Sequence, residues 1–378
     1  MIPVNEPLLD GNERRYVTEC IDSGWISSEG PFVERFEREL AGRVERRHGI
    51  AVCNGTAALE LAIAGLGLQP GDEVLMPTFT IISCAAAVIR RGCVPVLVDS
   101  DSKTWNMDVN QLEGRITPKT RAVMVVHIYG LPVDMDAIAR VARKHGLLVI
   151  EDASQMLGQT FRGQPCGSFG DISTFSFYPN KHITTGEGGM VLTNDEGLAA
   201  RCRSLRNLCF SSRRFIHEEL GYNFRMSNLQ AALGVAQLER LDEFVARKRQ
   251  MGNLYSRLLS DLDCLEMMPL STNYAENIFW VFGAVLHDSV PFEASEAMAR
   301  LGSRQIATRP FFWPMHEQPV FRNMGLFGGE RYPVAERLAR RGFYIPSGMA
   351  LQKAQMEMVV TAVKELFSAD NYQPTRAI

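Results

Sequence analysis

The stretch FSFYPNKHITTGEGG, residues 175–189, determines the interpretation of this chain. Its first residues are mostly apolar and predict a β-strand, and it ends in the glycine-rich Gly186-Glu187-Gly188-Gly189. Between these two features lies a single lysine, Lys181. An amine held on a tight loop at the end of a strand is well placed to form a Schiff base with an aldehyde cofactor. From these residues alone, an ordinary solvated lysine on a glycine turn is an equally good explanation.

An acidic pair upstream favours the cofactor interpretation. The apolar run Leu147–Ile150 predicts a strand, and Glu151-Asp152 follows it directly. Sheets of α/β proteins place their chemistry at the carboxyl ends of their strands. One of the two carboxylates is therefore a candidate partner for the pyridinium nitrogen of pyridoxal phosphate, PLP. The structural alternative for Asp152 is a helix N-cap, a common position for aspartate.

The composition describes a large globular protein without affinity for nucleic acid. The 378 residues are 46% hydrophobic, enough for a large core and two domains. The 40 basic residues and 43 acidic residues give a net charge of −3, so no basic surface for nucleic acid is expected. The eight cysteines occur singly, which favours reduced thiols in the cytoplasm over disulfides or a metal site. We expect no signal peptide, no membrane span and no bound metal.

Over the first two thirds of the chain, short apolar runs alternate with amphipathic helical patterns. This alternation predicts an α/β fold with a mostly parallel central sheet covered by helices on both faces. Expected strands are Ile50–Cys53, Glu73–Met76, Val94–Val98, Ala122–His127, Leu147–Glu151, Ile172–Phe177 and Met190–Thr193. Expected helices are Glu13–Ser23, Phe32–Arg47, Ala57–Leu66, Ile81–Arg91, Met135–His145 and Asn194–Asn207.

The last third of the chain has a different pattern. A long helical pattern covers Ser227–Leu262 and is expected to break or bend near Leu241-Asp242. The pattern therefore predicts a large domain of residues 1–245 and a smaller α+β domain of residues 246–378. Beyond the long helix, the expected elements are a strand over Asn277–Leu286 and helices over Phe292–Leu301 and Lys353–Ser368.

Several segments, taken in their order and spacing, resemble the DegT/DnrJ/EryC1/StrS family of PLP-dependent sugar aminotransferases. Besides residues 175–191 they are CNGTAALELA (53–62), GDEVLMPTFT (71–80), VHIYG (126–130), EDASQMLG (151–158) and GYNFRMSNLQAALGVAQLERLD (221–242). The resemblance extends from about Ile2 to beyond Pro346. It implies the PLP-dependent transferase fold of type I, that of aspartate aminotransferase, and the cofactor in its PLP and PMP forms.

The resemblance implies roles for two catalytic residues. Lys181 lies five residues from both Ser176 and Gly186, which is the spacing of the family. It corresponds to the lysine that binds PLP and moves a proton on the substrate. Family members that act as dehydratases carry histidine at this position, and here His182 is only the next residue. Asp152 corresponds to the aspartate that keeps the pyridine nitrogen protonated, so that the ring withdraws electrons from the substrate.

The resemblance also implies how the phosphate of PLP is bound. Gly55, Thr56 and Ala57 form a turn between an expected strand and an expected helix, where backbone N–H groups can hold a phosphate. Ser176 corresponds to a further phosphate contact. Asn223 corresponds to an asparagine that reaches the phosphate from the neighbouring subunit. We therefore expect a homodimer with active sites shared between its subunits.

Two further positions correspond to contacts with the cofactor ring. Gln155 lies where the family often carries Gln, Glu or His near the ring oxygen. Ile81 occupies the place where many relatives stack an aromatic residue on the ring, so aromatic stacking is lost there. A polar residue in a helical turn is the structural alternative for Gln155.

Three segments resemble the GDP-perosamine synthase subgroup of the family: residues 4–30, 308–316 and 340–348. Core or interface packing is the structural alternative for the two tryptophans among the matching residues, and a buried structural histidine is the alternative for His316. Gln155 departs from the subgroup, which commonly has Glu there, and residues 204–224 differ from its usual loop. The residues implied near the nucleotide-sugar substrate are Trp25, Ser27, Ser28, Arg225, Trp313 and His316.

The resemblance implies an aminotransferase that moves an amino group from L-glutamate to a nucleotide-linked 4-keto-6-deoxyhexose. GDP is favoured over dTDP or UDP as the nucleotide, and the product is a 4-amino sugar for the O-antigen of lipopolysaccharide. The alternatives are amination of a dTDP- or UDP-linked keto-sugar at C3 or C4, a PLP-dependent sugar dehydratase, and a non-catalytic regulatory protein on the same fold.

Overall fold

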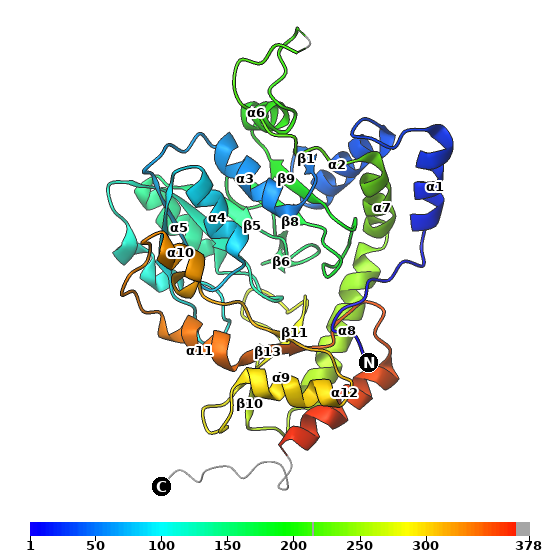
Figure 1. Cartoon of the computed structure of the whole chain (residues 1–378), viewed down its shortest axis with the longest axis vertical. Coiled ribbons are helices and arrows are strands. Elements are labelled where there is room, and N and C mark those ends of the chain that lie inside the picture. Colours follow the sequence, from blue (N-terminus) through cyan, green and yellow to red (C-terminus); the bar gives the residue numbers. More distant parts are fainter. Residues whose placement is uncertain (214, 368–378) are drawn as a thin grey trace.

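The structure, a computed structural model, describes residues 1–213 and 215–367. A seven-stranded sheet forms the centre of the larger part of the molecule (Figure 1), in the order β1-β9-β8-β5-β4-β2-β3. The pairings among β3, β2, β4, β5 and β8 are parallel, and β9 is antiparallel to both of its neighbours. The predicted mostly parallel sheet is therefore confirmed. The strands are β1 (His48–Val52), β2 (Glu73–Pro77), β3 (Val94–Val98), β4 (Thr120–Val126), β5 (Leu148–Asp152), β8 (Ile172–Ser176) and β9 (Gly189–Thr193).

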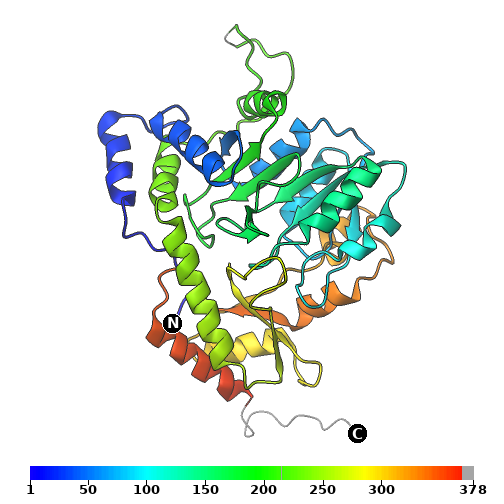
Figure 2. The same ribbon diagram turned by 180° about the vertical axis from the view of Figure 1, so that it is seen from behind.

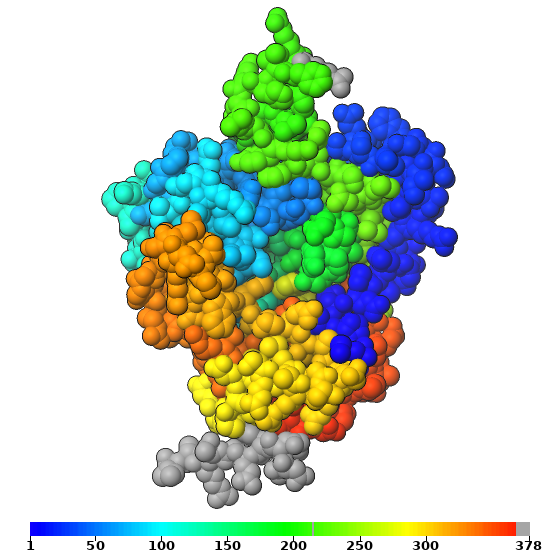
Figure 3. All heavy atoms as spheres, viewed as in Figure 1, coloured from blue at the N-terminus to red at the C-terminus, as the bar shows by residue number. Residues whose placement is uncertain are grey.

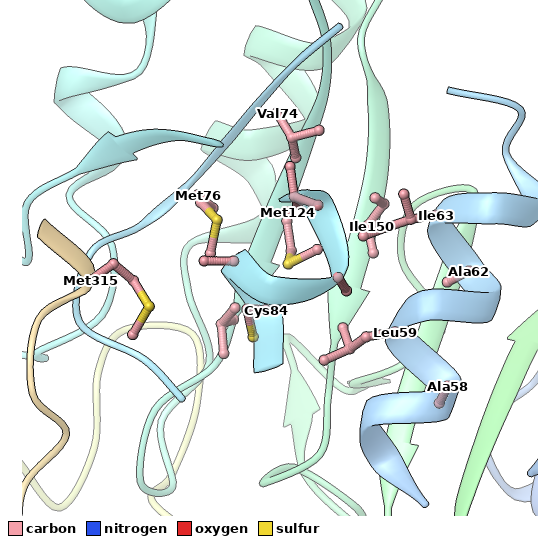
Figure 4. Close-up of a cluster of buried hydrophobic side chains, with 14 of the residues drawn as sticks. Ala58, Leu59, Ala62, Ile63, Val74, Met76, Cys84, Met124, Ile150 and Met315 are labelled. Carbon is pink, nitrogen blue, oxygen red and sulfur yellow. The ribbon is translucent and has the colours of Figure 1, made fainter. Parts of the chain in front are cut away.

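Both faces of this sheet are buried under helices. Along β2, Val74 and Met76 belong to one buried cluster and Leu75 to another, because successive side chains of a strand point to opposite faces. Figure 4 shows the first cluster, in which Met124 and Ile150 of the neighbouring strands face helix α3. The helices of this part are α1 (Glu13–Ser23), α2 (Pro31–Arg43), α3 (Gly55–Gly65), α4 (Ile82–Arg90), α5 (Met135–His145), α6 (Glu196–Arg206) and α7 (Asn228–Leu238).

A second, smaller sheet with its own core lies below the first in Figure 1. It has four antiparallel strands in the order β10-β11-β13-β12. Helices α8, α9 and α12 and residues from the N-terminus bury its apolar side chains. The strands are β10 (Leu265–Met267), β11 (Phe282–Leu286), β12 (Arg309–Pro310) and β13 (Gly342–Ile345), and the helices are α8 (Leu241–Leu258), α9 (Ala294–Ser303), α10 (Pro319–Asn323), α11 (Pro333–Arg341) and α12 (Lys353–Leu366). The remaining short elements are β6 (Thr160–Phe161), β7 (Gln164–Pro165), η1 (Val109–Gln111), η2 (Glu113–Arg115) and η3 (Met315–Glu317).

Two expected elements are shorter in the structure, each for a local reason. The helix expected to reach Arg47 ends at Arg43, and Glu45 has a left-handed φ of 57° that an α-helix cannot contain. The strand expected from Asn277 begins only at Phe282. There the Asn277 side chain accepts a hydrogen bond from the backbone N–H of Phe279 at 2.7 Å, and Phe279 has a φ of 49°. Residues 277–281 therefore turn before the strand starts.

The long helical pattern breaks two residues before the predicted position. Helix α7 ends at Leu238, and helix α8 begins at Leu241 and carries the chain from the large sheet to the small one (Figures 1 and 2). The N-terminal segment crosses in the opposite direction, since the Ile2 backbone N–H donates to the carbonyl of Gln305 beside the small sheet at 2.8 Å and the chain then runs to α1 in the larger part. Because α8 passes through residue 245, the division at that residue stays a proposal. Residues 368–378 lie outside the described part.

The segment that carries α10 and α11 returns to the large sheet. The Tyr332 hydroxyl donates to the carbonyl of Leu97 at 3.2 Å, and the Ala335 N–H donates to the carboxylate of Asp99 at 2.9 Å. The two parts are thus joined by three chain segments. Among the helices of residues 1–213 and 215–367, none has the length and apolar character of a membrane span.

Candidate active site

A cavity of about 670 Å³ lies where the carboxyl ends of β5 and β8 meet the first turn of α3. Residues of the second domain, among them Trp280 and Tyr344, also line it. Eight of the predicted site residues line this cavity: Gly55, Thr56, Ala57, Ile81, Asp152, Gln155, Ser176 and Lys181. The structure therefore brings together segments that are far apart in the sequence.

The alternation of strand β5 separates its two terminal acids. Asp152 lines the cavity with its side chain, where one carboxylate oxygen accepts the N–H of Ser154 at 3.0 Å and the other accepts the Cys84 thiol at 3.4 Å. Glu151 is buried on the opposite face and forms a hydrogen bond with His127 at 3.0 Å. Residues 153–159 form turns rather than a helix, so Asp152 does not act as a helix N-cap. Of the acidic pair, only Asp152 is available to a molecule in the cavity.

Lys181 reaches the cavity from the turn that follows β8. Its backbone N–H donates to the carbonyl of Tyr178 at 2.9 Å, and its Nζ lies 4.1 Å from the ring centre of Trp280. Burial lowers the pKa of the Lys181 amine to about 8, while the negative charge of Asp152 acts in the opposite direction. An amine with this pKa is partly neutral near neutral pH and can act as a nucleophile.

His182 does not share this position. Its side chain is buried and its Nε2 lies 3.4 Å from the carbonyl oxygen of Ile278, away from the residues that line the cavity. Burial, with the nearby charge of Lys248, lowers the pKa of His182 to about 3. The ring is therefore neutral at physiological pH, and Lys181 is the basic group that faces the cavity.

The first turn of α3 forms a site for an anion. The Asn54 side chain caps the helix by accepting the N–H of Ala57 at 2.8 Å. The N–H groups of Gly55 and Thr56 have no carbonyl partner within the helix, as is general at helix N-termini. Ser176 lies against this turn, because a Cβ at Gly55 would be 2.7 Å from the Cβ of Ser176. Free N–H groups and the positive end of the helix dipole favour a phosphate here.

The remaining two predicted ring contacts also lie at the cavity. The Gln155 side-chain oxygen accepts the backbone N–H of Tyr129 at 2.7 Å, so its orientation is fixed. Ile81 precedes helix α4, and 42% of its surface is exposed. Phe79, the nearest aromatic residue along the chain, is fully buried and does not line the cavity. The wall at Ile81 is thus aliphatic, as the sequence implied.

The predicted substrate contacts at the N-terminus do not line the cavity of their own chain. Trp25, Ser27 and Ser28 follow helix α1, and 52% of the surface of Trp25 is exposed. Their backbone is tied to α7, since the side chain of Asn228 donates to the carbonyl of Trp25 at 2.7 Å. They form part of the outer surface of the large domain.

Trp313 and His316 are also outside the cavity. Both ring nitrogens of His316 have partners, with Nδ1 2.9 Å from the hydroxyl of Thr78 and Nε2 3.2 Å from Glu336. His316 is only 2% exposed, as expected for a structural histidine. Trp313 is half-exposed, and the Arg340 guanidinium lies 5.1 Å from its ring centre.

Asn223 and Arg225 lie at the base of the segment that follows α6. This segment, residues 207–213 and 215–221, projects from the top of the molecule in Figure 3. The exposed Asn223 accepts hydrogen bonds from the Arg225 guanidinium at 2.8 and 3.0 Å. Neither residue lines the cavity of its own chain.

The sequence model of the DegT/DnrJ/EryC1/StrS aminotransferase family matches residues 7–364. The chain belongs to this family. The chain is also 40% identical to the GDP-perosamine synthase of Escherichia coli O157:H7, over 97% of this chain and 99% of the relative. The corresponding enzyme of Caulobacter vibrioides is 42% identical, over 97% and 98% of the two chains. The predicted family and enzyme class are thus confirmed.

Similarity to a solved aminotransferase structure confirms the fold. The aminotransferase TlmJ from Streptoalloteichus hindustanus superimposes with a TM-score of 0.89 at 31% identity, over 97% of this chain and 98% of that chain. A further relative, the putative pyridoxal phosphate-dependent aminotransferase EpsN of Bacillus subtilis, is 35% identical over 97% of this chain and 96% of its own. The fold is therefore that of PLP-dependent aminotransferases.

The sequence did not reveal the aromatic wall that residues 280–344 add to this cavity. The ring of Tyr129 stacks on Trp280 with centres 5.8 Å apart and on Phe312 with centres 5.4 Å apart. Trp280, Phe312 and Tyr344 line the cavity. In the sequence Trp280 belongs to an apolar run that resembles a core strand. Only the turn at Asn277 distinguishes it, and an asparagine before an apolar run is a weak signal.

Proposed function

We propose that this chain is a PLP-dependent aminotransferase that moves an amino group from L-glutamate to a GDP-linked 4-keto-6-deoxyhexose. The observation that carries the proposal is the convergence of Lys181, Asp152 and the first turn of α3 on one cavity. The similarity to GDP-perosamine synthases over nearly the whole chain supports the choice of substrate. The product would be a 4-amino sugar for a surface polysaccharide such as the O-antigen.

The chemistry of the donor groups fits PLP. The cofactor carries a phosphate, an aldehyde and a pyridine nitrogen, and the cavity offers a helix N-terminus, an amine and a carboxylate for them. When bound, PLP supplies an aldehyde for covalent attachment of amino groups and a ring that withdraws electrons. Gly55, Thr56 and Ser176 would hold its phosphate.

The chain's own residues then have separate tasks. Asp152 holds the proton on the pyridine nitrogen, because a permanent negative charge nearby favours the protonated ring. Lys181 would take a proton from the substrate carbon that bears the amino group and return it to the carbon on the other side of the amino nitrogen. A pKa of about 8 suits this exchange, because the amine gives up and regains its proton near neutral pH.

We further propose that the active enzyme is a homodimer with shared sites. Asn223 is exposed and lies outside the cavity of its own chain, at the base of a projecting segment. In this arrangement it contacts the phosphate bound by the other subunit. Trp25, Ser27, Ser28 and Arg225 are then candidates for contacts with the nucleotide-sugar.

The test is a comparison of nucleotide-sugars as amino acceptors. Purified protein is incubated with L-glutamate and a GDP-, dTDP- or UDP-linked 4-keto-6-deoxyhexose, and 2-oxoglutarate is measured. The expected result is fastest turnover with the GDP-linked sugar and none with Lys181→Ala. The matched control is Lys144→Ala, which removes an exposed lysine paired with Glu113 and should retain the wild-type rate. Equal turnover by Lys181→Ala, or no turnover with any keto-sugar, would refute the proposal.

A further inference from the structure

The free amine of Lys181 lies on the face of an aromatic ring from the second domain. Its Nζ is 4.1 Å from the ring centre of Trp280. The indole N–H of the same Trp280 donates to the carbonyl of Asn180 at 2.7 Å. One side chain thus contacts both the amine of Lys181 and the backbone immediately before it. Trp280 is 3% exposed, so these contacts are largely shielded from water.

Trp280 is itself held in place from two directions. Its backbone carbonyl accepts a hydrogen bond from Nζ of Lys248 at 2.8 Å. Lys248 is on helix α8, is 1% exposed, and donates a second hydrogen bond to the carbonyl of Ser347. On the other side the indole ring stacks on Tyr129 with an angle of 19° between the planes. The N–H groups of a buried amine need hydrogen-bond acceptors, so Lys248 ties the Trp280 backbone to α8.

We propose that Trp280 is a positioning residue that holds the amine of Lys181 beside the cofactor site whenever that amine carries a proton as an ammonium ion. The face of an indole ring carries partial negative charge and attracts a cation within about 6 Å of its centre. The inference rests on the proposed function only in taking Lys181 as the reacting amine.

The charged surroundings of Lys181 are consistent with this role. Burial disfavours the ammonium form, and the negative charge of Asp152 favours it. The Cys84 thiol stays neutral near neutral pH because burial raises its pKa well above the ordinary value, and the neighbouring His182 and Lys248 add no negative charge. The ring of Trp280 is therefore a second group that favours the ammonium, and it does so without a formal charge.

This contact has a use in transamination. Lys181 is released from the cofactor each time the amino group of a substrate takes its place. The released amine must stay close enough to move a proton, yet it has no covalent link to keep it there. The ring face gives it a defined place at the edge of the cavity.

The test measures the pKa of the Lys181 amine in the full-length, cofactor-free chain. Amines are labelled with a trace of acetic anhydride at a series of pH values, and the Lys181 peptide is quantified by mass spectrometry. Trp280→Leu keeps an apolar side chain over the amine but removes the ring face, whereas Trp280→Phe keeps a weaker ring face. The pKa should fall in the order Trp, Phe, Leu, and Trp280→Leu should lower it by about 0.5–1.5 units.

The direction of the shift separates the proposal from its alternative. If Trp280 acts only by excluding water, its loss relieves the burial of Lys181 and raises the pKa, which would overturn the proposal; an unchanged pKa would do the same. The matched control is Phe292→Leu, which removes the ring that lies 4.5 Å from the Arg300 guanidinium in the same domain and should leave the Lys181 pKa unchanged.

Trp280→Phe still tests the proposal where the leucine variant does not fold. Thermal unfolding shows whether each of the two variants is folded. The labelling needs no sugar substrate. A failure to aminate keto-sugars would therefore contradict the proposed function without affecting this measurement, and a wrong order of pKa values would contradict only the role of Trp280.

Discussion

A single methyl group added at Gly55 tests how closely helix α3 must approach strand β8. The Cβ of Gly55→Ala would lie 2.7 Å from the Cβ of Ser176 and 3.0 Å from its hydroxyl oxygen. Carbon atoms in contact are normally about 3.5–4.0 Å apart, so the turn must move by about 1 Å. The φ of Gly55 is not positive, so alanine brings no backbone strain of its own. The whole effect comes from this contact.

The magnitude should be larger for cofactor binding than for folding. Overpacking costs about 1–3 kcal/mol, of which alanine in a helix recovers about 0.5–1 kcal/mol. The unfolding free energy should therefore fall by at most about 2.5 kcal/mol. A shift of the turn also moves its N–H groups away from the phosphate. Each hydrogen bond to a charged group is worth about 1.5–3 kcal/mol, so PLP affinity should fall about 10- to 100-fold.

The assay is a titration of cofactor-free protein with PLP, followed by absorbance, with denaturant unfolding measured in parallel. The control is Gly42→Ala, where the new Cβ meets no atom within 4 Å and binding should be unchanged. The double variant Gly55→Ala/Ser176→Gly removes the atoms in conflict. It should recover stability but not affinity, because the Ser176 hydroxyl is lost. Wild-type PLP affinity in Gly55→Ala would refute the placement of the phosphate at this turn.

Three further predictions concern the buried charges and the assembly. Asp152→Asn should retain PLP but slow exchange of the glutamate α-proton by about 10²- to 10⁴-fold in an NMR assay. An exchange rate within a few-fold of wild type would exclude Asp152 as the partner of the pyridine nitrogen. Mixing inactive Lys181→Ala and Asn223→Ala chains should restore turnover, because one site of each heterodimer is intact. A fully active protein that is a monomer by light scattering would contradict active sites shared between subunits. Burial lowers the pKa of Lys248 to about 7. From about pH 7 to 10 the unfolded chain thus binds a proton that the folded chain does not. The difference in unfolding free energy between wild type and Lys248→Met, measured by denaturant titration, should therefore rise with pH in favour of wild type. A difference that does not change with pH would exclude the low pKa of Lys248.

Local signals in the sequence placed the two proposed catalytic residues beside predicted strands, and the family resemblance supplied their roles. Asp152 follows an apolar run that had to be a buried strand, and Lys181 lies on a short turn between a strand and a glycine-rich segment. In each case the functional residue is adjacent to an element whose pattern is strong. Because parallel strands bring their carboxyl ends to one edge, the two residues were expected to meet, and both line the same cavity.

The contribution of the second domain was not accessible in the same way. Trp280 lies about a hundred positions from Lys181 in the sequence, and its approach depends on the turn at Asn277 and the packing of α8. An aromatic residue in an apolar run looks the same whether it fills a core or lines a cavity. His316 shows the opposite case, since its motif suggested a substrate contact while the structure gives both ring nitrogens protein partners.

The pair Lys181-His182 shows why the register of one turn decides the chemistry. The side chain of His182 is buried and that of Lys181 is partly buried, and burial shifts the pKa of each downward. The effect on function differs because the ordinary values differ. The pKa of lysine falls to about 8, which keeps the group titratable near neutral pH, whereas that of histidine falls to about 3, which removes it from acid–base chemistry there. A shift of one residue in the turn after β8 would place in the cavity an imidazole, which cannot form a Schiff base, instead of the amine of Lys181. The hydrogen bond from the Lys181 N–H to the carbonyl of Tyr178 helps to fix the turn.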